Sequence, residues 1–246
     1  MKNIVIIPAR LNSQRLPNKL IEKIGNRYLF QIVYENILRC KFVDKVLIAT
    51  DSNEIAEICN DLNFNYLLTP NYFQSGTDRI SWAYQRINEN YDLVINVQGD
   101  EPLISSTDLD NFIEYICDKQ FDVATIITEI SNIEDISNPN TVKVVLNQKN
   151  EAMYFSRAPI PWKRNGMDNL DLNIDIYYKH IGVYAYKPSS LCNFAKLPPS
   201  DYEKIEKLEQ LRLLQAGYTY LCYEISKDLM SVDTLEDLEK VRELFK

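Results

Sequence analysis

Glycine and histidine are scarce in this chain: of its 246 residues, 6 are glycine and 1 is histidine. Neither G-x-x-x-x-G-K-[ST] nor a G-x-G-x-x-G after the first apolar run occurs, which argues against a P-loop ATPase and a dinucleotide-binding Rossmann site. G-x-S-x-G is missing as well, and a single histidine leaves little scope for a hydrolase triad. Three common enzyme classes are therefore disfavoured.

Long apolar runs and paired cysteines are also missing. No window approaches the roughly 18 apolar residues that a membrane span requires, and no apolar segment follows a basic one at the amino end. The 5 cysteines show neither C-x-x-C nor zinc-site spacing, and their odd number fits a reducing compartment. We therefore expect a cytoplasmic protein with no membrane partner.

Positive charge is in the minority, because 27 Lys and Arg residues face 35 Asp and Glu residues, for a net charge of −8. This balance argues against a nucleic-acid backbone as the main partner. The chain is long enough for one large domain, or one domain with a smaller lobe, and it needs no metal or disulfide to fold.

Short apolar runs alternate with segments of helical period, which predicts an α/β fold with a largely parallel sheet covered by helices. Strands are expected over residues 3–7, 45–49, 66–68, 93–97 and 123–128. Helices are expected over residues 28–39, 53–61, 78–87 and 107–119. Asp51 and Glu54 form a plausible capping box for the second of these helices.

The rhythm changes after about residue 131. Strands over 142–146 and 152–155, joined by a tight turn, predict a smaller antiparallel lobe. A strand over 178–186, a helix over 200–216 with a Ser200 and Glu203 capping box, a strand over 218–224 and a helix over 234–245 complete the chain. We expect a single domain, residues 1–246, with a lobe of roughly residues 131–187 inserted in its α/β core.

The first predicted strand leads into a loop that carries Arg10, Arg15 and Lys19. Ligands of open α/β sheets bind outside the carboxyl ends of the strands, so these cations are expected to face the site. Guanidinium and ammonium groups suit phosphate or carboxylate oxygens. Taken alone, the same loop could be a solvated basic surface.

Two carboxylates could share a divalent cation. Asp100 follows the predicted strand 93–97, and Mg²⁺ typically takes one or two protein carboxylates together with substrate phosphates. Asp233 precedes the last helix, where capping is the simpler role for an aspartate. Together with the cationic loop, the two carboxylates suggest nucleotidyl transfer.

Three further segments could supply specificity. Q-S-G-T-D-R over 74–79 leads into a helix whose free N–H groups could bind an anion, although an ordinary N-cap is at least as good an interpretation. His180 lies on a predicted strand, where a lone histidine is more often a surface or satisfied residue than a catalyst. Arg157 and Arg164 flank a proline-rich stretch that could hold two guanidinium groups for an acidic substrate.

Ten ordered motifs make the chain resemble the 3-deoxy-manno-octulosonate (Kdo) cytidylyltransferases, also called CMP-Kdo synthetases, nearly from end to end. They are I-I-P-A-R (6–10), R-L-P-N-K (15–19), A-T-D (49–51), Q-S-G-T-D-R (74–79), N-V-Q-G-D-E-P (96–102), N-P-N-T-V-K-V-V (138–145), Y-F-S-R-A-P-I-P-W (154–162), K-H-I-G-V-Y (179–184), K-L-E-Q-L-R (207–212) and V-D-T-L-E-D-L (232–238). The resemblance implies a Rossmann-like nucleotide-diphospho-sugar transferase fold with a mixed, mostly parallel sheet and an antiparallel dimerisation lobe.

The resemblance also implies a reaction in which CTP and Kdo give CMP-Kdo and pyrophosphate, with Mg²⁺ as cofactor. The nucleotide would be bound by Ala9, Arg10, Lys19, Ser75, Gly76, Thr77 and Arg79. The sugar acid would be surrounded by Arg15, Gln98, Arg157, Arg164, His180, Tyr184, Glu209 and Gln210. Asp100 and Asp233 would bind the metal and, with Arg10 and Lys19, carry catalysis. In that picture the histidine is a substrate ligand and not a base.

Two positions depart from the family pattern: Asn18 replaces a glycine in R-L-P-G-K, and Leu235 replaces a proline in V-D-T-P-E-D. Neither change removes a group expected to contact substrate.

A cytidylyltransferase for a related sugar acid, such as 8-amino-Kdo or a sialic-type acid, is the alternative within the enzyme class. A non-catalytic nucleotide-binding module is the alternative outside it. The family forms homodimers, and residues 131–162 are the expected interface.

Overall fold

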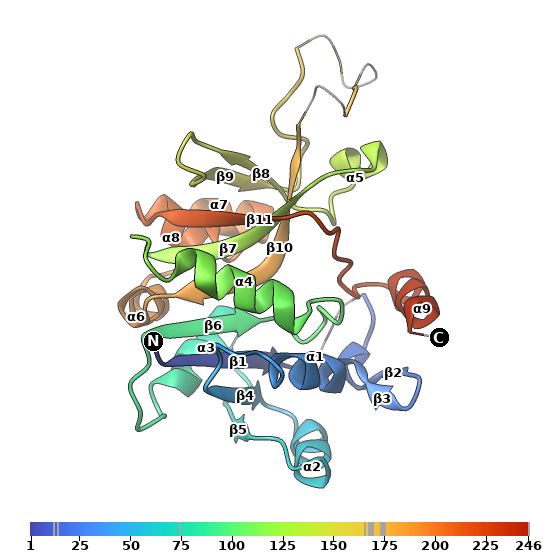
Figure 1. The fold of residues 1–246 in the computed structure, drawn as a ribbon, viewed down its shortest axis with the longest axis vertical. Helices are drawn as coiled ribbons and strands as arrows, with labels where there is room; N and C mark the ends of the chain where they lie inside the picture. Colours follow the sequence, from blue (N-terminus) through green and yellow to red (C-terminus); the bar gives the residue numbers. More distant parts are fainter. Residues whose placement is uncertain are drawn as a thin grey trace.

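A sheet of nine strands runs through the middle of the molecule (Figure 1), in a computed structural model that describes residues 1–11, 13, 15–73, 75–164, 166, 170–172 and 176–245. Seven strands form one row in the order β11-β7-β10-β6-β1-β4-β5. Their bounds are β1 Asn3–Ala9, β4 Lys45–Thr50, β5 Tyr66–Leu68, β6 Leu93–Val97, β7 Val123–Glu129, β10 Tyr178–Tyr186 and β11 Tyr220–Ile225.

Neighbouring strands in this row are parallel except at β10, which runs antiparallel to both β6 and β7. The predicted mixed, mostly parallel sheet is therefore confirmed. The remaining strands are β8 Lys143–Leu146 and β9 Ala152–Ser156, an antiparallel hairpin attached to the sheet because β8 also pairs with the start of β10. A separate two-stranded sheet joins β2 Lys23–Ile24 to β3 Arg27–Tyr28.

Helices cover both faces of the sheet, because the central strands are apolar on both. On β1, Val5 and Ile7 pack into one apolar core, while Ile4 and Ile6 pack into the other, as the two-residue period of a strand requires. The first core is closed by α1 Leu29–Ile37, α2 Asn53–Asp61, α4 Ser106–Ile116 and α9 Leu235–Leu244. The second is closed by α3 Gly76–Tyr84, α6 Pro188–Lys196 and α8 Leu211–Gln215.

Two local predictions are wrong. The single helix expected over 200–216 is two helices, α7 Asp201–Glu206 and α8, because Lys207 adopts a left-handed conformation with φ 55° that ends the first. The Ser200 and Glu203 capping box is present. Asp51 does not cap α2; Ser52 is the N-cap and accepts a hydrogen bond from Ile55 N.

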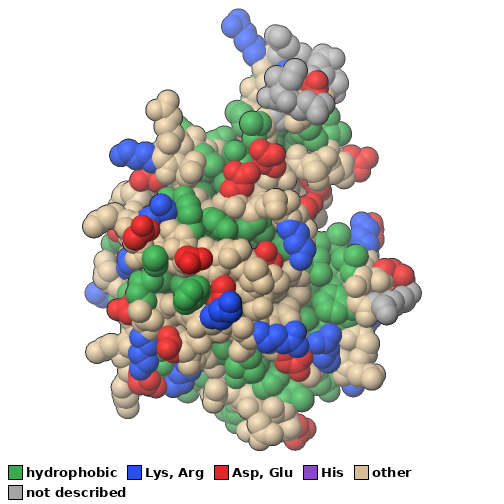
Figure 2. Space-filling view, in the orientation of Figure 1, with side chains coloured by type: hydrophobic (Ala, Val, Ile, Leu, Met, Phe, Trp, Pro, Cys, Tyr) green, Lys and Arg blue, Asp and Glu red, His purple; other side chains and the backbone are tan. Residues whose placement is uncertain are grey.

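Three elements were not anticipated: α6, the short helix α5 Ile133–Ser137 and the β2–β3 hairpin. A single 3₁₀ turn, η1 Lys19–Ile21, follows the basic loop. None of the helices in the described part of the chain is long and apolar enough to cross a membrane. On the face shown in Figure 2, basic and acidic side chains lie interspersed over the surface.

Candidate functional site

The carboxyl ends of β1 and β6 open into a cleft, where ligands of open α/β sheets bind. β1 ends at Ala9 and β6 at Val97, and the loops that follow them contribute Arg10, Lys19 and Asp100 to the lining. One cavity of ≈ 1190 Å³ lies here, and a second of ≈ 810 Å³ adjoins it. The two share the lining residues Arg15, Gln98, Asp100, Asn140, Arg157, Lys207, Glu209 and Asp233.

The ammonium of Lys19 lies between the two carboxylates expected to bind metal. Its Nζ donates to Asp100 Oδ2 at 2.5 Å and to Asp233 Oδ1 at 3.0 Å, and also to Val232 O at 3.0 Å. Burial alone would lower the pKa of Lys19, but the charges of Asp100 and Asp233 outweigh it and leave that pKa raised. Residues 19, 100 and 233, far apart in the sequence, thus form one charged cluster.

The two departures from the family pattern leave this cluster intact. Asn18 takes the left-handed conformation, φ 59°, that its glycine counterpart would permit. At the other departure, α9 begins at Leu235, and Thr234 is its N-cap in a capping box with Asp237. Asp233 is therefore not the cap of α9, which removes the simpler role considered for it.

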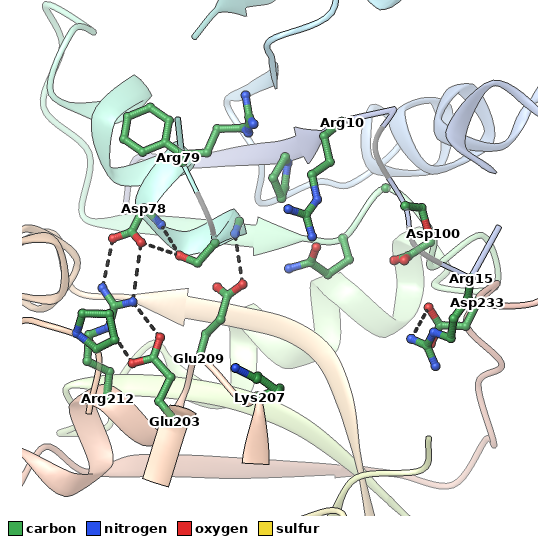
Figure 3. Close-up of a pocket in the computed structure, with 18 of the residues that line it drawn as sticks. Arg10, Arg15, Asp78, Arg79, Asp100, Glu203, Lys207, Glu209, Arg212 and Asp233 are labelled. Atoms are coloured by element: carbon green, nitrogen blue, oxygen red, sulfur yellow. Dashed lines mark hydrogen bonds and ion pairs between the residues drawn. The ribbon is translucent and has the colours of Figure 1, made fainter. Parts of the chain in front are cut away.

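Arg10 and Arg15 lie on the same loop as Lys19, and both line the larger cavity (Figure 3). Arg15 Nη2 pairs with Asp233 Oδ1 at 2.9 Å, and its Nη1 donates to Asn140 Oδ1 at 2.5 Å. Arg15 therefore links the carboxylate cluster to the segment before β8. Arg10 is exposed.

The amino end of α3 faces the same cavity, and a carboxylate already caps it. Ser75 is the N-cap and accepts a hydrogen bond from Asp78 N, so the simpler interpretation of this segment is confirmed. Glu209 accepts hydrogen bonds from Gly76 N and Thr77 N, both at 3.0 Å (Figure 3). The carboxylate of Glu209 thus occupies the amino end of α3, where the first N–H groups have no partner within the helix and the helix dipole is positive. Gln74 lies outside the described residues.

A buried ion-pair network holds α3 against α7 and α8. Arg212 donates from Nη1 to Asp78 Oδ1 at 3.0 Å and from Nη2 to Glu203 Oε1 at 2.6 Å (Figure 3). Its guanidinium also lies 4.0 Å from the centre of the Phe194 ring, a cation–π contact. Arg212 belongs to the K-L-E-Q-L-R motif, but its contribution was not anticipated.

Arg79, expected near the cytidine, is only 1% exposed. Its Nη2 pairs with Asp51 Oδ2 at 2.8 Å, and its Nη1 donates to Thr69 Oγ1. The structure thus brings Arg79 and Asp51 together, and Arg79 also lines the larger cavity. These contacts hold the start of α3 against the ends of β4 and β5.

The lone histidine lies in the second cavity beside Tyr184 and Gln210. His180 Nε2 is 3.0 Å from Thr125 Oγ1, whose proton is donated to Val183 O at 2.8 Å. His180 Nε2 is therefore the donor, which leaves Nδ1 as an acceptor. Burial lowers the pKa of His180 to about 3, so the ring is neutral near pH 7. Tyr184 Oη donates to Gln210 Oε1 at 3.3 Å.

Arg157 follows β9 and lines both cavities. Its Nε donates to Glu206 O and its Nη1 to Pro139 O, both at 2.8 Å. Arg164 is exposed and is not among the residues that line either cavity. The structure therefore separates the two arginines that were expected to act together.

Glu101 is a site residue that the sequence did not single out. It is 6% exposed, lines the second cavity, and accepts a long hydrogen bond of 3.4 Å from Gly182 N through Oε1. Among the described residues, its Oε2 has no hydrogen-bond partner. Burial, reinforced by the charge of Asp100, raises the pKa of Glu101 to about 8. Its place beside Asp100 in Q-G-D-E-P was the available signal.

The fold and the site are those of a nucleotidyltransferase: cations at the carboxyl ends of parallel strands, two carboxylates that converge, and a neighbouring polar cavity. A family model described as cytidylyltransferase matches residues 4–228. The chain belongs to the cytidylyltransferase family, as its motifs predicted.

Curated relatives agree over the full length. A 3-deoxy-manno-octulosonate cytidylyltransferase of Francisella tularensis subsp. holarctica (strain LVS) is 45% identical over 249 residues, covering 100% of this chain and 99% of that protein. One of Chloroherpeton thalassium is 42% identical over 98% of this chain and 97% of that protein.

Among solved structures, CMP:2-keto-3-deoxy-manno-octonic acid synthetase complexed with CTP aligns with a TM-score of 0.89 at 37% identity, covering 99% of this chain and 98% of that chain. A thymidylyltransferase of Bacillus anthracis, at 14% identity and a TM-score of 0.70 over 99% of this chain and 95% of that one, shares the fold alone.

Proposed function

We propose that this protein transfers CMP from CTP to the anomeric 2-hydroxyl of Kdo, which gives CMP-Kdo and pyrophosphate for lipopolysaccharide or capsule biosynthesis. The observation that carries this proposal is the Lys19, Asp100 and Asp233 cluster, in a chain that matches Kdo cytidylyltransferases along its full length. One end of the cleft carries Arg10, Lys19 and the amino end of α3, and the other carries Arg157 together with the polar side chains of His180, Tyr184 and Gln210. A triphosphate and a polyhydroxy acid fit these two ends.

On the nucleotide side, Arg10 and Lys19 hold the triphosphate, whose charge suits a guanidinium and an ammonium. The backbone of Ala9 and the segment Ser75, Gly76 and Thr77 contact the nucleoside, and Arg79 keeps this segment in place. The N–H groups of Gly76 and Thr77 are bonded to Glu209, so that carboxylate sets the shape of the loop.

On the acid side, Arg15 and Arg157 offset the carboxylate of Kdo, and Gln98, His180, Tyr184, Glu209 and Gln210 contact its hydroxyls. His180 presents a neutral ring with Nδ1 as acceptor, a suitable partner for a substrate hydroxyl. A histidine with this pKa takes no proton from the attacking hydroxyl near pH 7. A role for Arg164 stays a prediction, because it requires the exposed segment to approach the cavity.

Asp100 and Asp233 would hold Mg²⁺. The fit is supported by Lys19, whose ammonium stands between the two carboxylates as an internal cation, and Mg²⁺ needs only one or two protein carboxylates. When bound, the metal supplies charge stabilisation at the reacting phosphate. The oxygen of the sugar hydroxyl attacks the α-phosphorus in line and its proton is released to solvent. The bond from the α-phosphorus to the bridging oxygen breaks, pyrophosphate leaves, and Arg10 and Lys19 stabilise the charge that moves onto it.

The test is pyrophosphate release from CTP and Mg²⁺ with Kdo, 8-amino-Kdo and N-acetylneuraminate offered separately, and with ATP, GTP and UTP in place of CTP. Release with CTP and Kdo alone supports the proposal. Preference for another acid would change the substrate within the same class. If no pair of nucleotide and sugar acid released pyrophosphate, this result would contradict catalysis and favour a non-catalytic nucleotide-binding module.

We further propose that the protein is a cytoplasmic homodimer. Exposed apolar side chains within the expected interface, residues 131–162, support the dimer: Met153 on β9 is 63% exposed and Trp162 is 67% exposed. Light scattering is expected to give twice the chain mass of 28.7 kDa. A monomer at micromolar concentration would contradict the proposal.

A further inference from the structure

One lysine of the N-P-N-T-V-K-V-V motif has no part in the chemistry proposed above. Lys143 is the first residue of β8 and is 0% exposed. Its Nζ donates three hydrogen bonds, to Asn138 O at 2.8 Å, to Thr141 O at 2.6 Å and to Arg157 O at 2.7 Å. A lysine ammonium has three protons, so every donor is used, and each acceptor is a backbone carbonyl.

The three carbonyls belong to two segments that are distant in sequence and adjacent in space. One is the connection from α5 to β8, and the other follows β9. Burying an ammonium is costly unless hydrogen bonds compensate it, and burial lowers the pKa of Lys143 to about 8. In return, the three hydrogen bonds of Lys143 hold the two segments together.

Both segments form the wall of the acid side of the cleft. Pro139 O accepts from Arg157 Nη1 at 2.8 Å, and Asn140 Oδ1 accepts from Arg15 Nη1 at 2.5 Å. The two arginines proposed to meet the substrate carboxylate are thus oriented by the segment that Lys143 holds. Among the described residues, the hydrogen-bond partners of Lys143 Nζ all lie on the acid side, and the proposed nucleotide-binding loop around Ser75 contributes none of them.

We propose that Lys143 is a positioning residue for the sugar acid: its buried ammonium fixes the 138–141 segment against Arg157 and thereby sets Arg157 and Arg15 in the cavity. This inference rests on the proposed function. It assigns Lys143 a selective role, in binding the acid and not the nucleotide, which a purely structural lysine would not have.

The test compares KM for Kdo and KM for CTP in Lys143→Met and Lys143→Gln. Both variants remove the charge, and two are made so that the failure of one to fold leaves the other. Displacement of a positioned group by about 1 Å can cost up to about a hundredfold. We therefore expect KM for Kdo to rise roughly tenfold to a hundredfold, with KM for CTP unchanged.

Val144→Ala is the matched control. Val144 is the next residue of β8, is 1% exposed and packs in the apolar core. Its truncation should lower the melting temperature without changing the ratio of the two KM values. A second readout is the double variant with Arg157→Met, in which the Lys143 substitution should add little to the rise in KM for Kdo.

Two results would overturn the inference. One is an unchanged KM for Kdo in the folded Lys143 variants, and the other is an equal rise in both KM values together with full additivity in the double variant. The wild-type enzyme is assayed in parallel, so that a failure of the inference about Lys143 can be distinguished from a failure of the proposed function. If the wild type does not use Kdo, the function is wrong; if it does and the split is missing, the role of Lys143 is wrong.

Discussion

Because the chain has one histidine, a substitution at His180 removes all histidine titration from the protein. In the folded protein, burial lowers the pKa of His180 from 6.5 to about 3. Below pH 6.5 the unfolded chain takes up a proton that the folded chain refuses, so stability is lost as the pH falls through this window. Because one pKa unit corresponds to about 1.36 kcal/mol, the loss at about pH 5 is about 2 kcal/mol.

Glu101 acts in the opposite direction. Its pKa is raised from 4.5 to about 8 in the folded state, so the folded chain holds a proton that the unfolded chain releases. Its stabilising contribution is present below about pH 4.5 and is lost as the pH rises through about 8. Between about pH 5 and 7 it changes by about 3 kcal/mol. In the wild type, the pH-dependent changes in folding stability from His180 and Glu101 nearly cancel. The effect of His180 therefore appears only when the wild type is compared with a His180 variant.

The assay is urea unfolding of wild type and His180→Gln at about pH 7 and about pH 5, without nucleotide and with a chelator. Gln can still donate to Thr125 but does not titrate. Relative to wild type, the variant should gain about 2 kcal/mol on acidification, or about 4–8 °C in melting temperature for a chain of this size. Glu101→Gln should shift in the opposite sense. Equal pH dependence in wild type and His180→Gln would refute the assignment of a buried, neutral ring.

Three other substitutions test the site. Asp100→Asn should reduce turnover about 10²–10³-fold or more while the fold is kept, measured as pyrophosphate release and circular dichroism; near-normal activity at saturating Mg²⁺ would contradict a metal role. Arg79→Met leaves Asp51 without its buried partner and should cost about 3–5 kcal/mol in urea unfolding, whereas a cost within error of zero would mean that the pair is dispensable. In Gly182→Ala, the new Cβ would lie 3.2 Å from Gln98 Cγ and would displace this side chain, which is proposed to contact Kdo, so KM for Kdo should rise. An unchanged KM would show that Gln98 can move aside without loss of Kdo binding.

The strands and the charged clusters differ in how far the sequence predicts them. Strands β5, β6 and β10 have the predicted bounds, because apolar runs between turn signals depend on local pattern alone. The split between α7 and α8 was missed, since a lysine in the left-handed conformation leaves no compositional trace. The ends of β1, β4 and β7 were predicted to within two residues. The antiparallel direction of β10 was not visible in its own sequence, because it depends on the strands with which β10 pairs.

The same distinction holds within the site. The motifs identified Lys19, Asp100 and Asp233 one by one, because charged residues after apolar strands are visible in the sequence. Their convergence, with 2.5 Å and 3.0 Å between the Lys19 ammonium and the two carboxylates, depends on where the segment before α9 lies: Val232 N donates to Asp100 O, and Lys19 Nζ donates to Val232 O.

The sequence by itself determined the family, the alternation of strands and helices and the residues that carry charge, since these follow from local pattern and ordered motifs. The tertiary structure decided the state of each group. It paired Arg79 with Asp51, bound Glu209 to the amino end of α3, kept His180 and Glu101 neutral and joined two segments through Lys143. Burial and hydrogen-bond partners set these states, and both depend on residues that are distant in the sequence.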